Sequence, residues 1–528
     1  MTGSKDLTLS IDVGTGSVRA ALVALDGTIL AIAAVEQHQI VPSFGWAEQS
    51  VEGWWESVVR SIRAVLDEVS NAVHRVAMLC ACGQMHGTVL VDEAGRPTRA
   101  NAPLWNDKRT TDLVTAYEAA HPTADYLSLS GNPATPAWPG FKLAWLRDND
   151  PSAFERAAHV LMPKDFINLR LTGAIAMDRG DASCSFLMDP TSGAWSAAMA
   201  ASLGLDTSKL PPIRDGLDIL GTVTAEAAAA TGLLAGTPVL VGGADYPMAL
   251  YGSGVCRPGL ASDVTGTSCI LTVVAEQPLL DLEICNVATI EGHWGSFVLL
   301  ETGGDAVRWA RRAFHRNRVG YEQVVAEAAE ARPGCDGLFF LPYLSGERLG
   351  RHRNARAQYF GLAAAHGLPE LERATLEGVA FAAARHLAVM ERAAGRRVEQ
   401  VVASSGGAKA ELWLRIKASV YDRPILVPAE AECGVIGCAA MAQTATGRHA
   451  GLAEAARALV RYGAEVLPDP AAVDTYRRMQ PLFDRLYFNA QAFYADLDAL
   501  AAIGEPRLPA TPHHGDAIND VADTGGSP

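Results

Sequence analysis

The sequence predicts an α/β protein built from two halves with a common layout. Two short stretches, Asp12–Ser17 and Asp263–Ser268, use nearly the same Gly, Thr and Ser residues about 250 positions apart. Both lie between apolar runs typical of strands, and such runs alternate with helical patterns along the chain. A chain of 528 residues has the length of two large domains or roughly three ordinary ones. We therefore expect a duplicated fold whose halves close on one ligand from both sides.

Composition argues against several kinds of partner. The formal net charge is −15, from 44 basic and 59 acidic residues, which argues against nucleic acid and acidic membrane surfaces. Apolar residues make up 49% of the chain, as in an ordinary globular protein. Nine cysteines lie scattered without a Cys-x-x-Cys pair, which favours a reducing compartment over a disulfide framework. We expect a cytoplasmic protein with no signal peptide and no membrane span.

The first stretch, Asp12-Val-Gly-Thr-Gly-Ser17, is predicted to form a hairpin tip between the strands Leu7–Ile11 and Val18–Val23. Its glycines would let a phosphate approach the backbone N–H groups, and Asp12 offers a carboxylate to the Mg²⁺ of that phosphate. A single hairpin of this kind is more often an ordinary turn. The second copy favours the phosphate-binding interpretation. The chain contains no Gly-x-x-x-x-Gly-Lys-Ser/Thr loop.

Two polar loops at strand ends are candidate walls of a pocket for a polyol. One is Gly83-Gln-Met-His-Gly87, after the predicted strand Val76–Cys80, and the other is Leu104-Trp-Asn-Asp-Lys-Arg109. A lone histidine at a strand end is usually structural, but His86 lies close to glycines, so we expect its ring to face an open edge. Sugar hydroxyls need paired donors and acceptors, and amide and carboxylate side chains of the second loop could supply them.

A third candidate follows the predicted buried strand Val239–Val241. Gly242 and Gly243 are expected to end this strand, and Asp245 comes next. The carboxyl ends of strands carry the chemistry in many α/β proteins, and glycines let a ligand come close. Asp245 could equally cap the helix that follows. The two hairpins supply a phosphate site and the Gly83–Gly87 loop a sugar wall, so we interpret Asp245 as a general base, with which a capping role is compatible.

Helices and strands elsewhere are predicted from apolar periodicity. Helices are expected over 51–69, 163–171, 195–203, 222–230, 305–314, 370–390, 411–420, 435–446 and 473–500, and strands over 287–300 and from 401. Gly406 and Gly407 lie between the strand at 401 and the helix at 411. They could bring a nucleotide close to the backbone and the helix amino terminus, or simply allow tight packing.

The motifs, taken in order, resemble the FGGY carbohydrate kinases, and within them the xylulokinases. The resemblance covers nearly the whole chain, from Asp12–Ser17 to Glu432-Cys-Gly434, and leaves out the tail. Each motif alone is weak, but the ordered set is specific. The most specific are Gly83–Gly87, Leu104–Arg109, Leu161-Met-Pro-Lys-Asp165, Pro342-Tyr-Leu-Ser-Gly-Glu-Arg348 and Ser405-Gly-Gly-Ala-Lys409.

The resemblance implies an α/β fold of two actin-like (ribonuclease H-like) domains. Each would be a mixed five-stranded sheet flanked by helices, with the active site in the interdomain cleft. We expect residues 1–254 to bind sugar and phosphate, residues 255–503 to bind nucleotide, and residues 504–528 to form a disordered tail. The implied activity is the Mg-ATP-dependent phosphorylation of a ketopentose, D-xylulose to D-xylulose 5-phosphate. The expected partners are a small-molecule sugar and ATP. The possible assembly is a homodimer.

The resemblance also implies roles for individual residues. Asp245 matches the catalytic base, Asp12 matches the carboxylate that orients metal and phosphates, and both could hold Mg²⁺ through water. Met85 and His86 match the pair that contacts the sugar together with Asp245. Nucleotide and phosphate binding would involve Gly14, Thr15, Gly16, Ser17, Arg19, Gly266, Thr267, Ser268, Gly406, Gly407 and Lys409.

Two departures from the family pattern concern the substrate. Tyr246 and Pro247 follow the base where the family usually has Asn-Ala, and Val264-Thr265 replaces the Leu-Gly common in xylulokinases. A kinase for another ketose or a polyol, such as ribulose, a tetritol or a deoxy sugar, is therefore the main alternative. A second alternative is an actin-like ATPase that acts as a sensor or scaffold, although it would not need the Met85-His86 loop. A dinucleotide-binding oxidoreductase is disfavoured, because no Gly-x-Gly-x-x-Gly lies between a strand and a helix.

Overall fold

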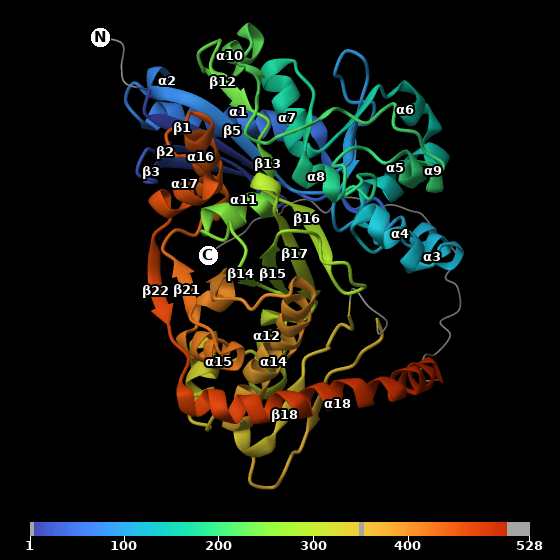
Figure 1. The fold of residues 1–528 in the computed structure, drawn as a ribbon, viewed down its shortest axis with the longest axis vertical. Coiled ribbons are helices and arrows are strands. Elements are labelled where there is room, and N and C mark those ends of the chain that lie inside the picture. Colours follow the sequence, from blue (N-terminus) through green and yellow to red (C-terminus); the bar gives the residue numbers. More distant parts are fainter. Residues whose placement is uncertain (1–4, 348–352, 504–528) are drawn as a thin grey trace, which may run out of the picture.

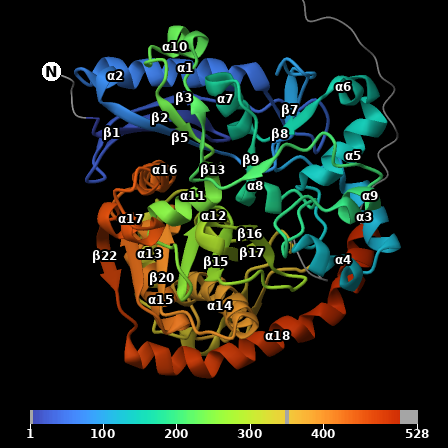
Figure 2. The same ribbon diagram turned by 45° about the horizontal axis from the view of Figure 1, so that its top comes forward.

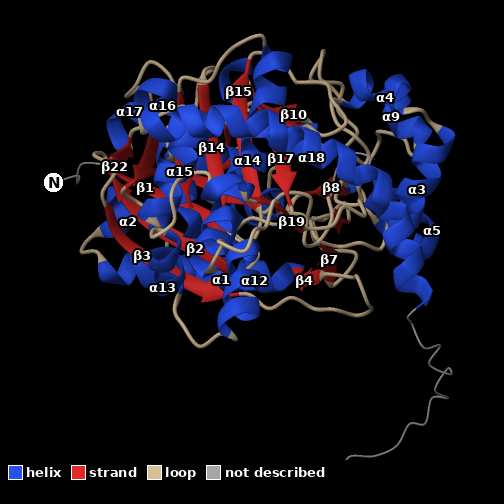
Figure 3. Cartoon of the chain, turned by 90° about the horizontal axis from the view of Figure 1, so that it is seen from below, coloured by secondary structure: helices blue, strands red, loops and turns tan. Residues whose placement is uncertain are grey.

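The computed structural model describes residues 5–347 and 353–503, so the predicted tail at 504–528 lies outside the described residues. The chain forms two mixed sheets with helices on their faces, one above the other in Figure 1. The first half, from blue to green, holds one sheet, and the second half, from yellow-green to red, holds the other. Figure 3 shows the strands enclosed between helices. The predicted α/β class is confirmed.

The first sheet has the strand order β11-β12-β5-β1-β2-β3. Its strands β1, β2 and β3 form an antiparallel meander, and β5 runs parallel to both β1 and β12. The short strand β13 also pairs with β5. The bounds are β1 Leu7–Val13, β2 Ser17–Ala24, β3 Ile29–Glu36, β5 Val76–Gly83, β11 Ile219–Thr222, β12 Pro238–Leu240 and β13 Gly243–Ala244.

The second sheet has the order β16-β17-β15-β14-β20-β21-β22. Here β14, β15 and β17 form the antiparallel meander, and β20 runs parallel to β14 and β21. The bounds are β14 Leu260–Thr265, β15 Cys269–Ala275, β16 Cys285–Ala288, β17 Trp294–Leu300, β20 Gln400–Ser404, β21 Ile425–Pro428 and β22 Tyr462–Val466. Five strands in each sheet therefore share one order and direction, and five strands per domain is what the resemblance implied. The antiparallel edge strand β11 and the short parallel strand β13 bring the first sheet to seven strands, and the antiparallel edge strands β16 and β22 bring the second to seven.

Equivalent helices cover equivalent faces of the two sheets. Helix α1, Val51–Glu68, packs Trp54, Val58 and Ile62 into the core of the first half, and Ser50 caps it by accepting a hydrogen bond from Gly53 N at 3.1 Å. Helix α7, Pro163–Thr172, packs into the same core. In the second half, α14, Leu368–Ala394, and α15, Glu411–Tyr421, occupy the corresponding face. Helix α14 extends beyond the predicted 370–390 at both ends.

Two helices form a close contact between the halves. They are α11, Asp245–Gly252, and α16, Cys433–Ala445. A Cβ atom on Gly252 would lie 1.7 Å from the carbonyl oxygen of Cys433, and one on Gly437 would lie 2.0 Å from that of Met248. Glycine is therefore required at both positions, because the two backbones nearly touch.

Helix α16 comes from the second half of the chain but covers the first sheet. The Ser10 hydroxyl on β1 donates to the Val435 carbonyl at 2.9 Å. Figures 1 and 2 show α16 beside the strands of the first half. The predicted domain boundary after residue 254 falls between α11 and β14. That these positions divide two domains stays a prediction.

The remaining elements surround the two sheets. Helix α18, Pro470–Ile503, runs along the outer side of the second half (Figure 2). No helix within the described ranges is long and apolar enough to cross a membrane. The other helices are α2 Ala72–Arg75, α3 Thr111–Ala120, α4 Thr123–Ser130, α5 Pro139–Asn149, α6 Pro151–Arg156, α8 Arg179–Ser183, α9 Ala197–Ser202, α10 Ala225–Thr231, α12 Gly304–His315, α13 Tyr321–Ala328 and α17 Leu452–Leu459, with 3-10 turns η1 Ile290–Gly292, η2 Cys335–Gly337 and η3 Gly406–Lys409. The other strands are β4 Glu48–Ser50, β6 Val89–Val91, β7 Asn101–Pro103, β8 His159–Leu161, β9 Met177–Asp178, β10 Ile213–Arg214, β18 Phe339–Leu341 and β19 Gln358–Phe360.

Candidate active site

Asp245 is the first residue of α11, directly after β13. Ala244 occupies the cap position, so the capping role considered for Asp245 is not what the structure shows. Burial raises the pKa of the Asp245 carboxyl to about 7, the negative charge of Asp12 adds to this, and hydrogen bonds from the Tyr246 and Met85 backbones oppose it. A carboxyl group with this pKa can exchange a proton near neutral pH, as a general base must.

The strand that leads to Asp245 breaks at Gly242, as the sequence predicted, but it does not end there, because β13 continues it from Gly243. Gly242 interrupts it with φ +72°, and a Cβ atom there would lie 2.1 Å from the Ala81 carbonyl oxygen. Pairing with β5 then resumes at Gly243. The Asn168 side chain supports the interruption by donating to the Val241 carbonyl at 2.8 Å. These contacts fix the backbone that positions Asp245.

A cavity of about 240 Å³ brings together three of the predicted site residues, Met85, His86 and Asp245. Most of its wall is apolar, and His86 and Asp245 contribute an imidazole and a carboxyl group to it. The other lining residues are Trp105, Thr135, Ala137, Trp138, Tyr246, Ile270, Cys285, Phe297 and Leu299. Three of these, Cys285, Phe297 and Leu299, lie on β16 and β17 of the second half. The cavity therefore lies between the two halves.

His86 is held in an uncommon backbone conformation, with φ +66°. Its carbonyl accepts a hydrogen bond from Lys142 Nζ at 2.8 Å, and its ring stands edge-on to Trp138 with centroids 4.9 Å apart. Burial, aided by the Lys142 charge, lowers the pKa of His86 to about 3. Its Nδ1 atom has no hydrogen-bond partner among the described residues. The neutral ring therefore has a nitrogen available for a substrate hydroxyl.

The Leu104–Arg109 loop contributes to this cavity, but not through the amide and carboxylate side chains that we predicted. Trp105 lines the cavity, whereas Asn106 and Asp107 do not. Asp107 is buried, pairs with Arg109 at 2.7 Å and accepts from Ala47 N at 2.7 Å. Asp107 and Arg109 of this loop are therefore structural, and its aromatic residue forms the wall.

Asp12 lies on β1 and faces the start of α16. Arg19 Nη1 lies 3.3 Å from Asp12 Oδ2, and Arg19 also reaches Glu432 at 3.6 Å. The Oδ1 atom of Asp12 is buried without a hydrogen-bond partner in the described part of the chain. Burial raises the pKa of the Asp12 carboxyl, and the Arg19 charge opposes the rise. An unpaired buried carboxylate oxygen close to Asp245 fits a hard divalent cation.

The tip of the first hairpin lies against the small cavity. The Thr15 hydroxyl donates to Gln84 Oε1 at 2.9 Å and accepts from Trp105 Nε1 at 3.1 Å. Gly14 N donates to the Ser17 carbonyl at 3.1 Å, which closes the turn. A side chain on Gly16 would meet open space. The hairpin thus joins the wall of the small cavity to Asp12.

The second hairpin forms part of a larger cavity of about 700 Å³. Gly266, Thr267, Gly406, Gly407 and Lys409 all line it, as predicted for nucleotide-binding residues. Ser268 is not a lining residue; its carbonyl accepts from Gly266 N at 2.9 Å within the turn. Of the described residues, only residues of the second half line this cavity, so it does not include the predicted Gly14–Ser17 or Arg19.

Two family descriptions match the chain. The N-terminal domain of the FGGY family of carbohydrate kinases matches residues 7–252, and the C-terminal domain matches residues 261–446. The chain belongs to the FGGY family of carbohydrate kinases. The predicted class of enzyme, a sugar kinase that uses ATP as co-substrate, is therefore confirmed, and the sensor or scaffold alternative is not retained.

Relatives and solved structures agree with this assignment. The kinase is 31% identical to a xylulose kinase of Escherichia coli (strain K12), over 91% of this chain and 98% of that protein. It is 29% identical to an autoinducer-2 kinase of Yersinia enterocolitica, over 94% of this chain and 95% of that protein. The crystal structure of xylulose kinase from Rhodospirillum rubrum superposes with a TM-score of 0.88 at 30% identity, covering 93% of this chain and 100% of that one.

Sequence reasoning missed much of the wall of each cavity. Arg308, Tyr321, Glu322, Val325 and Trp413 line the larger cavity of the kinase from α12, α13 and α15. Trp138 and Phe297 line the smaller one. These residues lie in ordinary helix, strand and loop segments outside the recognised motifs, and only the tertiary fold brings them to the cavities.

The Leu161–Asp165 motif supports the site from behind. Lys164 Nζ is buried among the carboxylates of Asp165, Asp178 at 3.0 Å and Asp181 at 3.7 Å. Asp178 also caps α8, accepting from Gly180 N at 2.7 Å, and lies 3.6 Å from where a Gly243 Cβ would be. The buried lysine therefore anchors the acidic groups beside the strand that leads to Asp245.

Proposed function

We propose that this kinase transfers the γ-phosphoryl group of ATP to the terminal hydroxyl of D-xylulose and forms D-xylulose 5-phosphate. The observation that carries the proposal is the single cavity that contains Asp245, His86 and Met85 between the two halves. The xylulose kinases among the relatives, covered over nearly their whole length, support this choice of sugar.

In this proposal each residue of the small cavity has a distinct task. The Nδ1 atom of His86 would bind a sugar hydroxyl, and Met85 and Trp105 would pack against the carbon chain. Asp245 would accept the proton of the attacking hydroxyl, which its pKa of about 7 allows at neutral pH. Phosphoryl transfer depends mainly on alignment and on neutralising charge, so a fixed position of Asp245 matters more than strong basicity.

The phosphate groups would be held by both hairpins. Glycine-rich backbone at Gly266 and Gly406–Gly407 would receive the nucleotide in the larger cavity, with Lys409 near the phosphates. Asp12 would hold Mg²⁺ through its unpaired Oδ1, with Asp245 contributing through water. When bound, the Mg²⁺ ion neutralises charge on the transferring phosphoryl group. Arg19 keeps Asp12 oriented through their contact at 3.3 Å.

A kinase for another ketose or a polyol is the second candidate. Tyr246 lines the small cavity, and its hydroxyl is already bonded to Thr272. The Tyr246 ring also packs edge-on against Phe297, with centroids 5.6 Å apart. Next to the base, the cavity therefore offers an aromatic surface where the family usually has an asparagine. The autoinducer-2 kinase among the relatives supports keeping this candidate.

A panel of sugars in an ADP-release assay tests the proposal. D-xylulose should give the highest kcat/KM among D-xylulose, D-ribulose, tetritols and deoxy sugars. Preference for another sugar would favour the second candidate. Asp245→Asn should lower kcat by about 10³-fold while sugar and ATP still bind. Near-normal turnover by this variant would refute the role of Asp245 as base.

The proposal also includes a cytoplasmic location and a homodimeric assembly. None of the nine cysteines, all of which lie within the described ranges, forms a disulfide, which is consistent with the reducing cytoplasm. Sedimentation of the purified kinase would test the homodimer that we considered from the sequence.

A further inference from the structure

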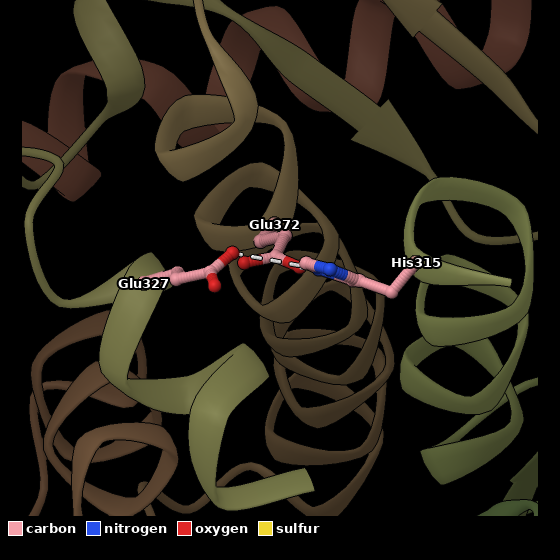
Figure 4. Close-up of side chains that lie close together, drawn as sticks. All are labelled: His315, Glu327 and Glu372. Atoms are coloured by element: carbon pink, nitrogen blue, oxygen red, sulfur yellow. Dashed lines mark hydrogen bonds and ion pairs between the residues drawn. The ribbon is translucent and has the colours of Figure 1, made fainter. Parts of the chain in front are cut away.

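Three helices of the second half bring a histidine and two glutamates together. His315 ends α12, Glu327 lies in the last turn of α13, and Glu372 lies in the second turn of α14. Figure 4 shows the imidazole and the two carboxyl groups pointing toward one another. One nitrogen or oxygen atom from each residue lies within 4.8 Å of the other two. This number and type of donor atoms is typical of a metal site with three protein ligands.

Hydrogen bonding satisfies Glu327, which accepts from Gln323 Nε2 at 2.9 Å, but it does not satisfy Glu372. The Nε2 atom of His315 contacts Glu372 Oε1 and also lies 3.5 Å from Glu327 Oε2. A single N–H group cannot serve two carboxylates well. The Glu372 side chain is 0% exposed, and its Oε2 atom has no hydrogen-bond partner in the described ranges. Such a buried unpaired oxygen is costly unless another ligand fills the gap.

Burial raises the pKa of Glu372, and His315 opposes the rise. When both glutamates are ionised, the cluster carries uncompensated negative charge. With a protonated His315 the two glutamates still leave one negative charge, and with a neutral ring they leave two. The acidic cluster at Asp165, Asp178 and Asp181 differs, because Lys164 lies buried among its carboxylates. No lysine or arginine pairs with Glu327 or Glu372 within the described part of the molecule. A dication would neutralise the charge at His315, Glu327 and Glu372.

We propose that His315, Glu327 and Glu372 bind a divalent transition-metal ion of the Zn²⁺ class. An imidazole nitrogen together with carboxylate oxygens suits Zn²⁺, and water would complete the coordination. Mg²⁺ prefers oxygen ligands alone, so this site is distinct in chemistry from the one proposed at Asp12.

The metal would fix the three helices that form one wall of the larger cavity. Val307 and Arg308 of α12, Tyr321 and Val325 of α13, and Leu376 of α14 all line it. A bound ion would therefore hold this wall in place and favour nucleotide binding. This consequence rests on the proposed nucleotide role of the cavity, whereas the metal site itself does not.

Zinc titration of the full-length protein tests the site. The protein is stripped with a chelator and titrated with Zn²⁺ by calorimetry, without nucleotide and with excess Mg²⁺. Wild type should bind one equivalent, and Glu327→Gln, His315→Gln and Glu372→Gln should each weaken binding at least about tenfold. Glu327 is the most exposed ligand, with 25% of its side chain accessible, so its variant should fold even if the others do not.

Three controls separate this site from other binding. Glu330→Gln removes an exposed glutamate near the same helix end and should bind zinc normally. Asp12→Asn should keep the zinc, because it alters only the proposed Mg²⁺ site. The double variant His513→Gln/His514→Gln removes the histidine pair of the tail and should also keep it.

Two results would overturn the site: no zinc bound by wild type, or unchanged affinity in all three ligand variants. Either would show that His315, Glu327 and Glu372 only contact one another and hold no ion. The nucleotide consequence has a separate readout, since zinc should lower the KM for ATP several-fold in wild type and not in Glu327→Gln. An unchanged KM for ATP despite bound zinc would overturn that consequence alone. Because zinc binding is measured without substrates, failure of the proposed sugar kinase activity would not affect it.

Discussion

The two hairpins of this kinase share a sequence pattern, yet their aspartates have opposite surroundings. Asp263 is fully buried and bonded at 2.8 Å to Lys417 through both oxygens, and at 2.8 Å to the Tyr421 hydroxyl. Asp12 has a single cation, Arg19, at 3.3 Å and keeps a buried oxygen without a partner. One carboxylate is neutralised within the core, and the other is left available for a ligand.

The difference comes from a shift of one residue. Gly14 and Gly266 each donate the hydrogen bond that closes their turn. Asp12 stands two residues before its glycine, whereas Asp263 stands three before its own. Because side chains alternate between the faces of a strand, the shift turns the two carboxylates to opposite faces. Asp12 faces α16 between the halves, and Asp263 faces α15 in the core of the second half. The same residue type in two copies of a sequence repeat therefore need not occupy the same structural position.

The largest effect should follow from the loss of the Asp12 charge. Asp12→Asn should lower kcat/KM for Mg-ATP by about 10³-fold, because the proposed metal site loses its carboxylate. Folding should be unaffected or improved, since a buried charge with an unpaired oxygen disappears. Initial rates over a range of Mg²⁺ and ATP concentrations, together with urea unfolding, measure both. Unchanged Mg²⁺ dependence would show that Asp12 holds no metal.

Asp263→Ala should lower stability and leave activity nearly unchanged, the reverse of Asp12→Asn. The substitution leaves Lys417 buried without its partner, which should lower the free energy of unfolding by about 3 kcal/mol. The activity of the protein that remains folded should change little, because Asp263 lines neither cavity. Urea unfolding and the specific activity of the folded fraction are the measurements.

A second substitution distinguishes the ion pair from general packing damage. Lys417→Met in the Asp263→Ala background removes the uncompensated charge and should recover part of the lost stability. No recovery in the double variant would mean that Asp263 stabilises the core in another way.

The sequence predicted the fold, and it named candidate site residues from backbone motifs. Asp245, Met85 and His86 were named from their loops, and the structure places them in one cavity. The five-strand core of each sheet was implied by the ordered motifs. The three residues come from local strand and glycine patterns, whereas the five-strand core is what the resemblance to the FGGY kinases implied.

Other features could not be predicted, because they depend on contacts between distant segments. Asn106 and Asp107 have the chemistry of a sugar site, but Arg109 and the Ala47 backbone bind Asp107 instead. Phe297 and Tyr321 line cavities from elements that carry no motif. The partner of Asp263, Lys417, lies 154 positions away in sequence. The repeat alone therefore gave no sign that Asp263 is structural.

The smallest effect, a dependence of stability on pH, should have opposite signs at the two aspartates. Burial raises the pKa of Asp12 above 3.8. Burial alone would also raise the pKa of Asp263, but the Lys417 charge and its hydrogen bonds hold it below 3.8. Asp12 should therefore lose its stabilising contribution as the pH rises from 3.8 through its folded pKa. Asp263 should contribute fully above pH 3.8 and lose that contribution as the pH falls through its lower folded pKa.

The two pH dependences can be compared by denaturant unfolding between pH 3 and pH 7 without Mg²⁺. The proteins to be unfolded are wild type, Asp12→Asn and Asp263→Asn. The stability of wild type minus that of Asp12→Asn should decrease with rising pH. The same difference for Asp263→Asn should increase with pH up to about 4 and then level off. Parallel curves would mean that both carboxylates have the same surroundings in solution. That result would remove the physical basis for assigning Asp12 to the ligand and Asp263 to the core.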